Sequence, residues 1–91
     1  MPKSSSTEKL LEYIAKSLVE NPKAVKVTLD RSENLITLNL KVDPEDLGLV
    51  IGKGGKTIRA IRNLIRLQAI KEGEKVDVHL IDKEDVAAAK K

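Results

Sequence analysis

A chain of 91 residues can hold one domain at most, and with no cysteine and a single histidine it can form neither a disulfide framework nor a zinc site. Its net charge of +3 combines 17 basic with 14 acidic residues, so charge alone favours a nucleic-acid partner only slightly. Tyr13 is the only aromatic residue, which argues against RNA-recognition motifs and OB-folds, since both stack bases on exposed rings.

The N-terminal sequence MPKSSSTEKL lacks the apolar stretch of a signal peptide, and no apolar run elsewhere approaches the length of a membrane span. Together with the absence of cysteine, this predicts a cytoplasmic protein without a membrane segment. We expect one domain over residues 6–82, preceded by a flexible N-terminus, residues 1–5, and followed by a C-terminal tail, residues 83–91.

The first expected element is a helix over residues 6–20. Apolar residues recur along it at helical spacing: Leu10, Leu11, Ile14 and Leu18. Ser5, three residues before Glu8, resembles the capping box that begins a helix. Pro22 disfavours helical geometry in the residue before it, so the helix is expected to end there.

Three segments alternate apolar and polar residues with the period of two that half-buried strands show: 24–30, 35–42 and 75–82. The polar sequence DRSEN joins the first two, which predicts a hairpin. We expect one face of the resulting sheet to pack against helices and the other face to be more polar.

Two helices separated by a glycine-rich turn are expected between the second and third strands. Asp43 is suited to cap the first helix, with Pro44 at its first position. The sequence GKGG at residues 52–55 ends this helix, and a longer one follows up to Gly73. The core face of the longer helix is expected to hold Ile58, Ile61, Leu64 and Ile65. Its residues pointing away from that core are expected to be Lys56, Arg59, Arg62, Asn63 and Arg66.

The predicted order is therefore helix–strand–strand–helix–helix–strand. This is an α+β domain in which three helices pack on a three-stranded sheet.

The stretch GLVIGKGGKTIRAI contains four glycines, and three possible roles for them fit the sequence poorly. Gly55, Lys56 and Thr57 match the end of a P-loop, but Val50 stands where its first glycine belongs, and a helix precedes the turn in place of a strand. A dinucleotide fingerprint needs a glycine at the position of Thr57. A plain helix–helix turn needs fewer glycines, because each costs roughly 0.5–1 kcal/mol relative to alanine in a regular element.

The interpretation that fits best is contact with the backbone of a nucleic acid. The turn consists of Gly52, Lys53, Gly54 and Gly55. Its glycines leave one surface without side chains, so that phosphates can approach the main chain. The following helix directs its free N–H groups and positive dipole end to the same place. Lys53, Lys56 and Arg59 add cations. Such a site holds a backbone and does not by itself read sequence.

The same stretch resembles the signature of the KH domain, V-I-G-x-x-G-x-x-I. Val50, Ile51, Gly52, Gly55 and Ile58 match it position by position. The expected order of elements, with a helix and a strand before the strand–helix–helix–strand core, resembles the type II KH topology. In length and in its NP and PEDLG sequences, the chain is similar to small bacterial single-KH proteins of the KhpA type.

The resemblance implies a domain that clamps about four nucleotides of single-stranded RNA. It implies phosphate contacts from Gly52 to Gly55, from Lys56 and from Arg59, and an apolar floor under the bases to which Ile51 and Ile58 would contribute. It further implies an RNA chaperone or post-transcriptional regulator that pairs with itself or with a larger Jag-type KH protein. No cofactor and no metal are implied.

A second hypothesis is that the chain is mainly a dimerisation module, because Leu64, Leu67 and Ile70 exceed what the small sheet can cover. The sequence offers no candidate catalytic group. His79 is interpreted as a surface residue, and Asp43, Glu45 and Asp46 as helix-capping residues. We therefore expect the protein not to be an enzyme.

Overall fold

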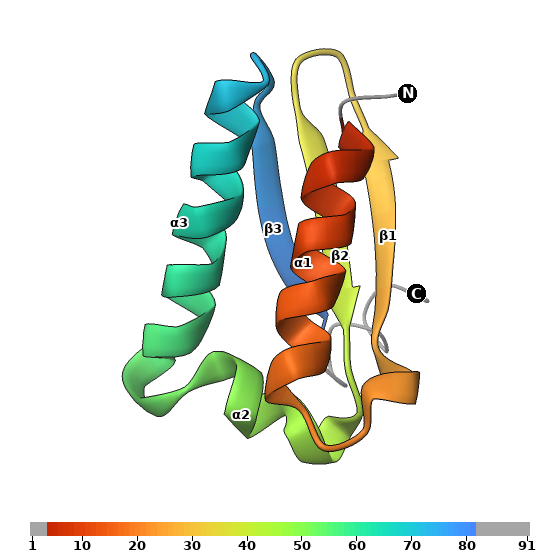
Figure 1. Cartoon of the computed structure of the whole chain (residues 1–91), viewed down its shortest axis with the longest axis vertical. Helices are drawn as coiled ribbons and strands as arrows, with labels where there is room; N and C mark the ends of the chain where they lie inside the picture. Colours follow the sequence, from red (N-terminus) through yellow and green to blue (C-terminus); the bar gives the residue numbers. More distant parts are fainter. Residues whose placement is uncertain (1–3, 82–91) are drawn as a thin grey trace, which may run out of the picture.

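The structure, a computed structural model, describes residues 4–81. Its helices, strands and short 3-10 turns (η) follow in the order α1 (Ser4–Leu18), η1 (Pro22–Ala24), β1 (Lys26–Arg31), β2 (Ile36–Lys41), η2 (Pro44–Asp46), α2 (Leu47–Ile51), η3 (Lys53–Gly55), α3 (Lys56–Lys71) and β3 (Val76–Ile81) (Figure 1). This order confirms the predicted α+β domain. Within residues 4–81, no helix is both long and apolar enough to cross a membrane. The expected tail, residues 83–91, lies outside the described residues.

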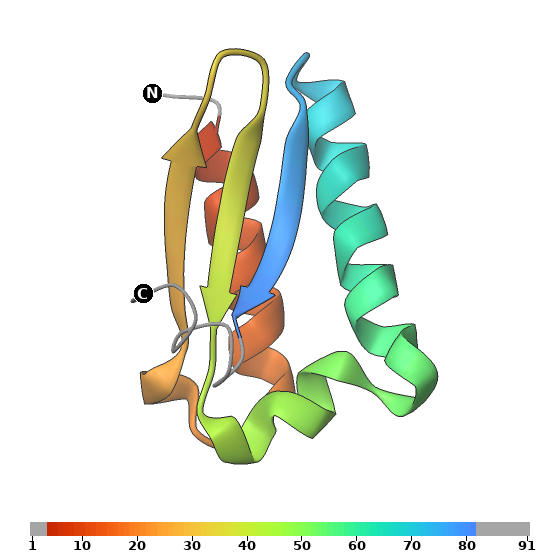
Figure 2. The same ribbon diagram turned by 180° about the vertical axis from the view of Figure 1, so that it is seen from behind.

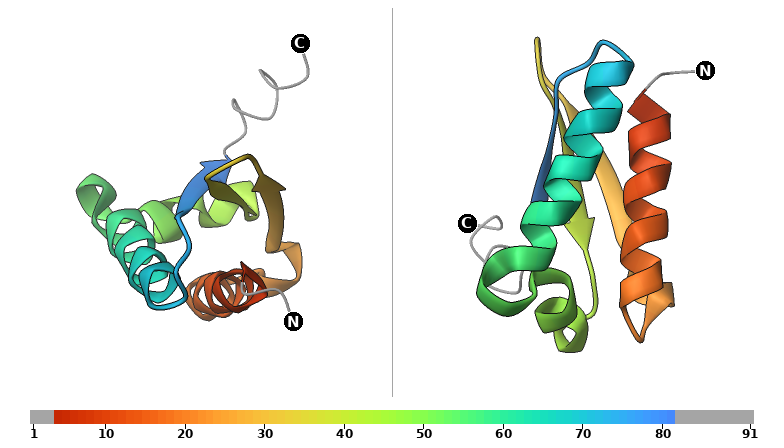
Figure 3. Two further views of the ribbon diagram at one scale, coloured as in Figure 1. Left: turned by 90° about the horizontal axis from the view of Figure 1, so that it is seen from above. Right: turned by 60° about the vertical axis from the view of Figure 1, so that its left-hand side comes forward.

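The central strand of the sheet is β2. It pairs with β1 in antiparallel register, with Val27 opposite Leu40, and with β3 in parallel register, with Leu38 opposite Val78. A parallel neighbour requires a long crossover, which α2 and α3 supply. Figures 2 and 3 show α1 and α3 on the same side of the sheet, so the other side is left open by the helices. The crossover carries the glycine-rich turn to the end of the molecule at which β2 leaves the sheet.

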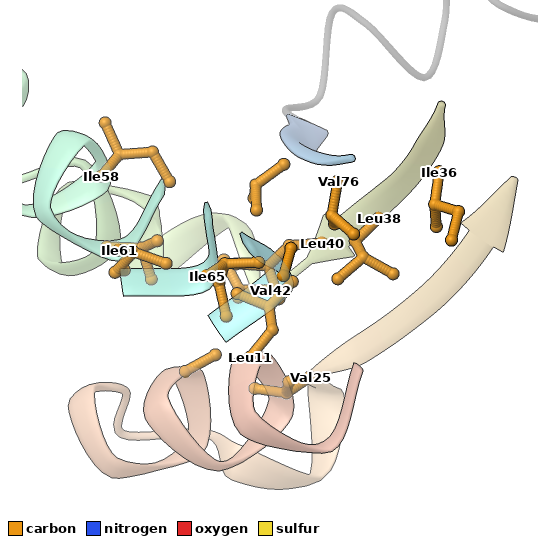
Figure 4. Close-up of a cluster of buried hydrophobic side chains, with 14 residues drawn as sticks. Leu11, Val25, Ile36, Leu38, Leu40, Val42, Ile58, Ile61, Ile65 and Val76 are labelled. Carbon is orange, nitrogen blue, oxygen red and sulfur yellow. The ribbon is translucent and has the colours of Figure 1, made fainter. Parts of the chain in front are cut away.

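One continuous apolar core lies between the helices and the sheet (Figure 4). Alternation along β2 sends Ile36, Leu38 and Leu40 into it, with Leu38 and Leu40 fully buried. The largest side chains that the helices bury completely are Leu11 of α1 and Ile65 of α3. The burial of each valine, leucine or isoleucine side chain stabilises the fold by about 1.5–3 kcal/mol, and this fixes α3 against the sheet.

The bounds of α1 differ from those predicted. The helix occupies Ser4–Leu18, where residues 6–20 were expected. Ser5 lies inside the helix, so its assignment as the capping residue was wrong. The 3-10 turn η1, which begins at Pro22, was not expected, because three residues are too few to show a period.

Leu64 does not belong to the buried face of α3. Its side chain is 51% exposed, whereas the buried positions of that helix are Ile58, Ile61, Ile65 and Ala69. Successive residues of a helix are rotated by about 100°, so the position directly before Ile65 points away from the core. Leu64 instead joins the exposed apolar residues Leu67 and Ile70.

Asp46 joins the start of α2 to the segment that follows α1. The Asp43 carboxylate caps η2 as predicted, accepting a hydrogen bond of 2.9 Å from the Glu45 amide. Asp46, by contrast, does not cap its own helix. It is buried, and its carboxylate accepts bonds from the Glu20 amide at 3.3 Å and from the Asn21 amide and side chain at 3.0 and 3.2 Å. Its predicted role as a helix cap was therefore wrong.

Replacing Asp46 with alanine is expected to lower the free energy of unfolding by about 2–3 kcal/mol, because three donors would lose a charged acceptor in a buried place. Urea denaturation followed by circular dichroism measures this loss. Glu45→Ala is the matched control, since Glu45 is exposed and should change stability by less than about 0.5 kcal/mol. Equal stability of the two variants would contradict a structural role for Asp46.

Candidate nucleic-acid interface

The turn between α2 and α3 has a backbone that requires glycine. Gly52, Gly54 and Gly55 have φ angles of 76°, 64° and 78°. Residues with a Cβ rarely adopt this region, and within residues 4–81 no non-glycine residue has a positive φ. The chain thus leaves α2, forms the single turn η3 and begins α3 within four residues. Because a helix precedes the turn, the context is not that of a P-loop.

The glycines differ in what surrounds them. A Cβ on Gly52 would overlap the side chain and the amide nitrogen of Thr57. A Cβ on Gly55 would lie 3.2 Å from the Arg59 guanidinium, and one on Gly54 would meet nothing within 4 Å. Gly52 is therefore needed for close packing within the turn. Gly54, which is exposed, instead presents bare backbone to whatever approaches from outside.

Some of the amides in this region already have partners. The Gly52 N–H donates to the Gly48 carbonyl at 2.9 Å, and the Gly55 N–H donates to the Gly52 carbonyl at 3.0 Å. No such bond involves the amides of Lys53 and Gly54. The first amides of a helix also have no partner within that helix. The turn and the start of α3 together offer several backbone donors to an anionic ligand.

Three cationic side chains surround this backbone. Lys53, Lys56 and Arg59 are all exposed, and none forms an ion pair with another described residue. The helix from Lys56 to Lys71 contains no acidic residue. The positive end of the helix dipole therefore adds to side-chain charges that no nearby acid on α3 neutralises. This arrangement favours an anion with several charges.

The two apolar residues of the predicted site are placed differently. Ile51, the last residue of α2, is half-buried beside the turn. Ile58 is only 8% exposed and belongs to the core cluster, as Figure 4 shows. The structure thus places Ile51 partly at the surface next to Gly52, and Ile58 in the core.

Arg62 and Arg66 bind β3. The sequence predicted only that both residues point away from the core. The Arg62 Nε donates to the Val78 carbonyl at 3.1 Å, and Arg66 forms an ion pair of 3.1 Å with Asp77. These contacts tie α3 to the outer edge of β3, whose backbone groups would otherwise lack strand partners. Sequence spacing carries no signal for them, because it does not say which strand lies beside the helix.

Gly52→Ala is expected to lower the free energy of unfolding by more than about 2 kcal/mol, since a positive φ and overlap with Thr57 act together. Gly48→Ala is the control. Gly48 lies inside α2, and a Cβ on it would meet nothing within 4 Å, so alanine there should stabilise by up to about 1 kcal/mol. Thermal denaturation measures both effects. Equal stability of the two variants would contradict a tight turn at Gly52.

Comparison with known proteins agrees with this geometry. A family model described as KhpA/KhpB, KH domain, matches residues 8–80. The RNA-binding protein KhpA of Clostridium perfringens is 50% identical over 74 residues, which cover 81% of this chain and 99% of that protein. The RNA-binding protein KhpA of Aquifex aeolicus is 36% identical over 78 residues, which cover 86% of this chain and 99% of that protein.

Among solved structures, a variant of Era from Aquifex aeolicus bound to GDP and AlF4− matches with a TM-score of 0.65 at 20% identity. The match covers 91% of this chain and 33% of that one, so the chain spans about a third of the Era structure. At this identity the likeness shows the fold alone.

The two KhpA relatives are named as RNA-binding proteins, and the KhpA/KhpB family is not a family of enzymes. This confirms the prediction of a non-enzymatic protein. A type II order of elements, a glycine turn between α2 and α3, and matches over most of the chain all lead to one assignment. The chain belongs to the KhpA/KhpB family of KH-domain proteins.

Proposed function

We propose that the protein binds single-stranded RNA through the turn Gly52–Gly55. The observation that carries this proposal is the exposed, positive-φ backbone at Gly54, which lies at the start of a helix and among three cations without ion-pair partners in the described part of the chain. The relatives named RNA-binding protein KhpA support RNA as the ligand.

Phosphates would approach the turn at Gly54, where no side chain obstructs them. The amides of Lys53 and Gly54 would donate hydrogen bonds, and Lys53, Lys56 and Arg59 would supply charge. Ile51 would contact a base from the side of α2, with Ile58 supporting that surface from within the core. A groove of this kind holds about four nucleotides, so one copy offers few contacts and binds with modest affinity.

The biological role that fits such binding is that of a cytoplasmic RNA chaperone or post-transcriptional regulator. Weak, backbone-directed contacts allow many RNAs to bind and leave. Two copies joined in a dimer would raise the effective concentration of the second site and so increase affinity without new contacts.

A second candidate function, dimerisation, has an observation of its own. Leu64, Leu67 and Ile70 on α3 are 51%, 64% and 71% exposed. Leu64 and Leu67 are neighbours on one face of the helix, and Ile70 follows one turn later. Such a face is suited to a second copy or to the KH domain of a larger Jag-type protein. It is compatible with RNA binding, because the turn Gly52–Gly55 lies at the beginning of α3.

The double variant Lys53→Asp/Gly54→Asp is expected to lower affinity for a single-stranded RNA pool at least tenfold and to flatten the salt dependence, because phosphate contacts are lost and repulsion is added. Lys71→Asp/Gly73→Asp is a close control. It makes the same substitutions at the other end of α3, where Gly73 also has a positive φ, of 75°, and open space around it. Fluorescence anisotropy across a salt series measures binding, and circular dichroism confirms folding. Equal loss in both variants, or in neither, contradicts the proposed site.

Leu67→Gln is expected to weaken self-association at least tenfold, because it places an amide in the centre of the apolar face. Sedimentation velocity at high micromolar concentration measures the monomer–dimer equilibrium. Leu49→Gln, at a position 47% exposed on α2, makes the same change away from that face and should leave the equilibrium unaltered. A strictly monomeric unchanged protein, both alone and with KH-domain partners, would contradict the dimerisation function.

A further inference from the structure

On the face of the sheet that the helices leave open, the strand residues form three rows, and all but Ile81 are polar. Alternation along the strands sends the core residues to one side and every second residue to the other. The strand register then aligns the outward residues across the sheet as Lys26, Lys41 and Ile81, then Thr28, Asn39 and His79, then Asp30, Thr37 and Asp77. Figure 2 views the molecule from this side.

The first row contains two lysines directly opposite each other. Lys26 and Lys41 are both exposed, and neither side chain forms a hydrogen bond or an ion pair with another residue in the part of the chain that the structure describes. Like charges at directly opposed positions of an antiparallel pair destabilise a sheet. An anion between the two ammonium groups would convert this repulsion into attraction. Lys23 in η1, also exposed, lies three residues before Lys26 and adds to the charge at this end.

Within residues 4–81, no acidic side chain forms an ion pair with either lysine. Asp30 and Asp77 occupy the row at the opposite end of the strands, and Asp77 is paired with Arg66. Asp43 follows β2 closely, but its carboxylate accepts the Glu45 amide. Among residues 4–81, the open face therefore carries its two lysines at one end, called here the basic end, and its two aspartates at the other.

The basic end is the one nearer to the turn Gly52–Gly55. Figures 1 and 2 show that the end of β2, where Lys41 lies, and the turn between α2 and α3 are at the same end of the molecule. The chain itself runs from Lys41 through η2 and α2 to that turn. A strand of nucleic acid held at the turn can thus pass over the edge of β3 onto the lysine row.

We propose that Lys26 and Lys41 form a second phosphate-binding surface, which holds RNA that extends beyond the nucleotides bound at the turn Gly52–Gly55. This inference rests on the proposed RNA binding and assigns a further surface to it. The two ammonium groups bind phosphates, Ile81 offers an apolar contact for a ribose or base, and Thr28 and Asn39 in the adjacent row can form hydrogen bonds with the sugar or base.

The surface makes affinity depend on RNA length. An RNA of about 4 nucleotides fills the groove at the turn and does not reach the sheet, whereas one of about 12 nucleotides reaches both surfaces. Each phosphate contact with a single strand contributes about 0.7 to the slope of log affinity against log salt, so two contacts add about 1.4 for the longer RNA only.

The experiment compares mixed-sequence RNAs of these two lengths, of about 4 and about 12 nucleotides, in NMR titrations of the full chain across a salt series. Lys26→Gln/Lys41→Gln is expected to lower affinity for the longer RNA about tenfold, to reduce its salt slope by about 1.4, and to leave the shorter RNA unaffected. Amide shifts in residues 26–28 and 39–41 of the unchanged protein should appear with the longer RNA alone. The variant should melt at a higher temperature, because it removes the repulsion between the two lysines.

Lys71→Gln/Lys75→Gln is the matched control, since it removes the same charge from two exposed lysines at the other end of α3. If both variants bind the longer RNA like the unchanged protein, or lose affinity equally, the second surface is overturned while the proposed function stands. If the unchanged protein binds neither RNA at low salt, the proposed function fails and this inference with it.

Discussion

The reversal of the chain between α2 and α3 is the constraint from which the candidate site follows. Three of the four residues in that turn have φ between 64° and 78°, and a Cβ on the first would overlap Thr57. Only glycine satisfies both conditions, and it leaves a surface without side chains as a consequence. The geometry that lets two helices meet at this angle therefore also creates the bare backbone that a phosphate can approach.

The fold holds that turn in place from two directions. From one side, Ile58, Ile61 and Ile65 anchor α3 in the core, while Arg62 binds the backbone of β3. From the other, the Asp46 carboxylate joins the start of α2 to the segment after α1. A site that depends on backbone amides needs such support, because the donors cannot adjust their direction independently as side chains can.

Elements with a clear period or a strong local signal were predicted well from the sequence. Alternation placed all three strands, and Asp43 with Pro44 marked the start of the helical segment before the turn. The errors occurred where a residue's role depends on contacts distant in sequence. Asp46 was interpreted as a local cap because its partners are 25 and 26 residues away. Arg62 was predicted only to point away from the core, because no pattern in α3 indicates that β3 lies beside it. The site residues come from one contiguous stretch, which is why the sequence alone could nominate them.

The helix α3 carries three groups of residues, and its length keeps two of them apart. Its buried positions recur over all of its turns, whereas Lys56 and Arg59 lie in the first turn and Leu64, Leu67 and Ile70 in later ones. At 1.5 Å per residue, the apolar residues begin about 10 Å or more from the glycine turn. A partner bound to them does not need to cover the backbone of the glycine turn. A dimer formed through α3 would therefore keep both turns accessible, so that RNA binding and self-association can act together on one RNA.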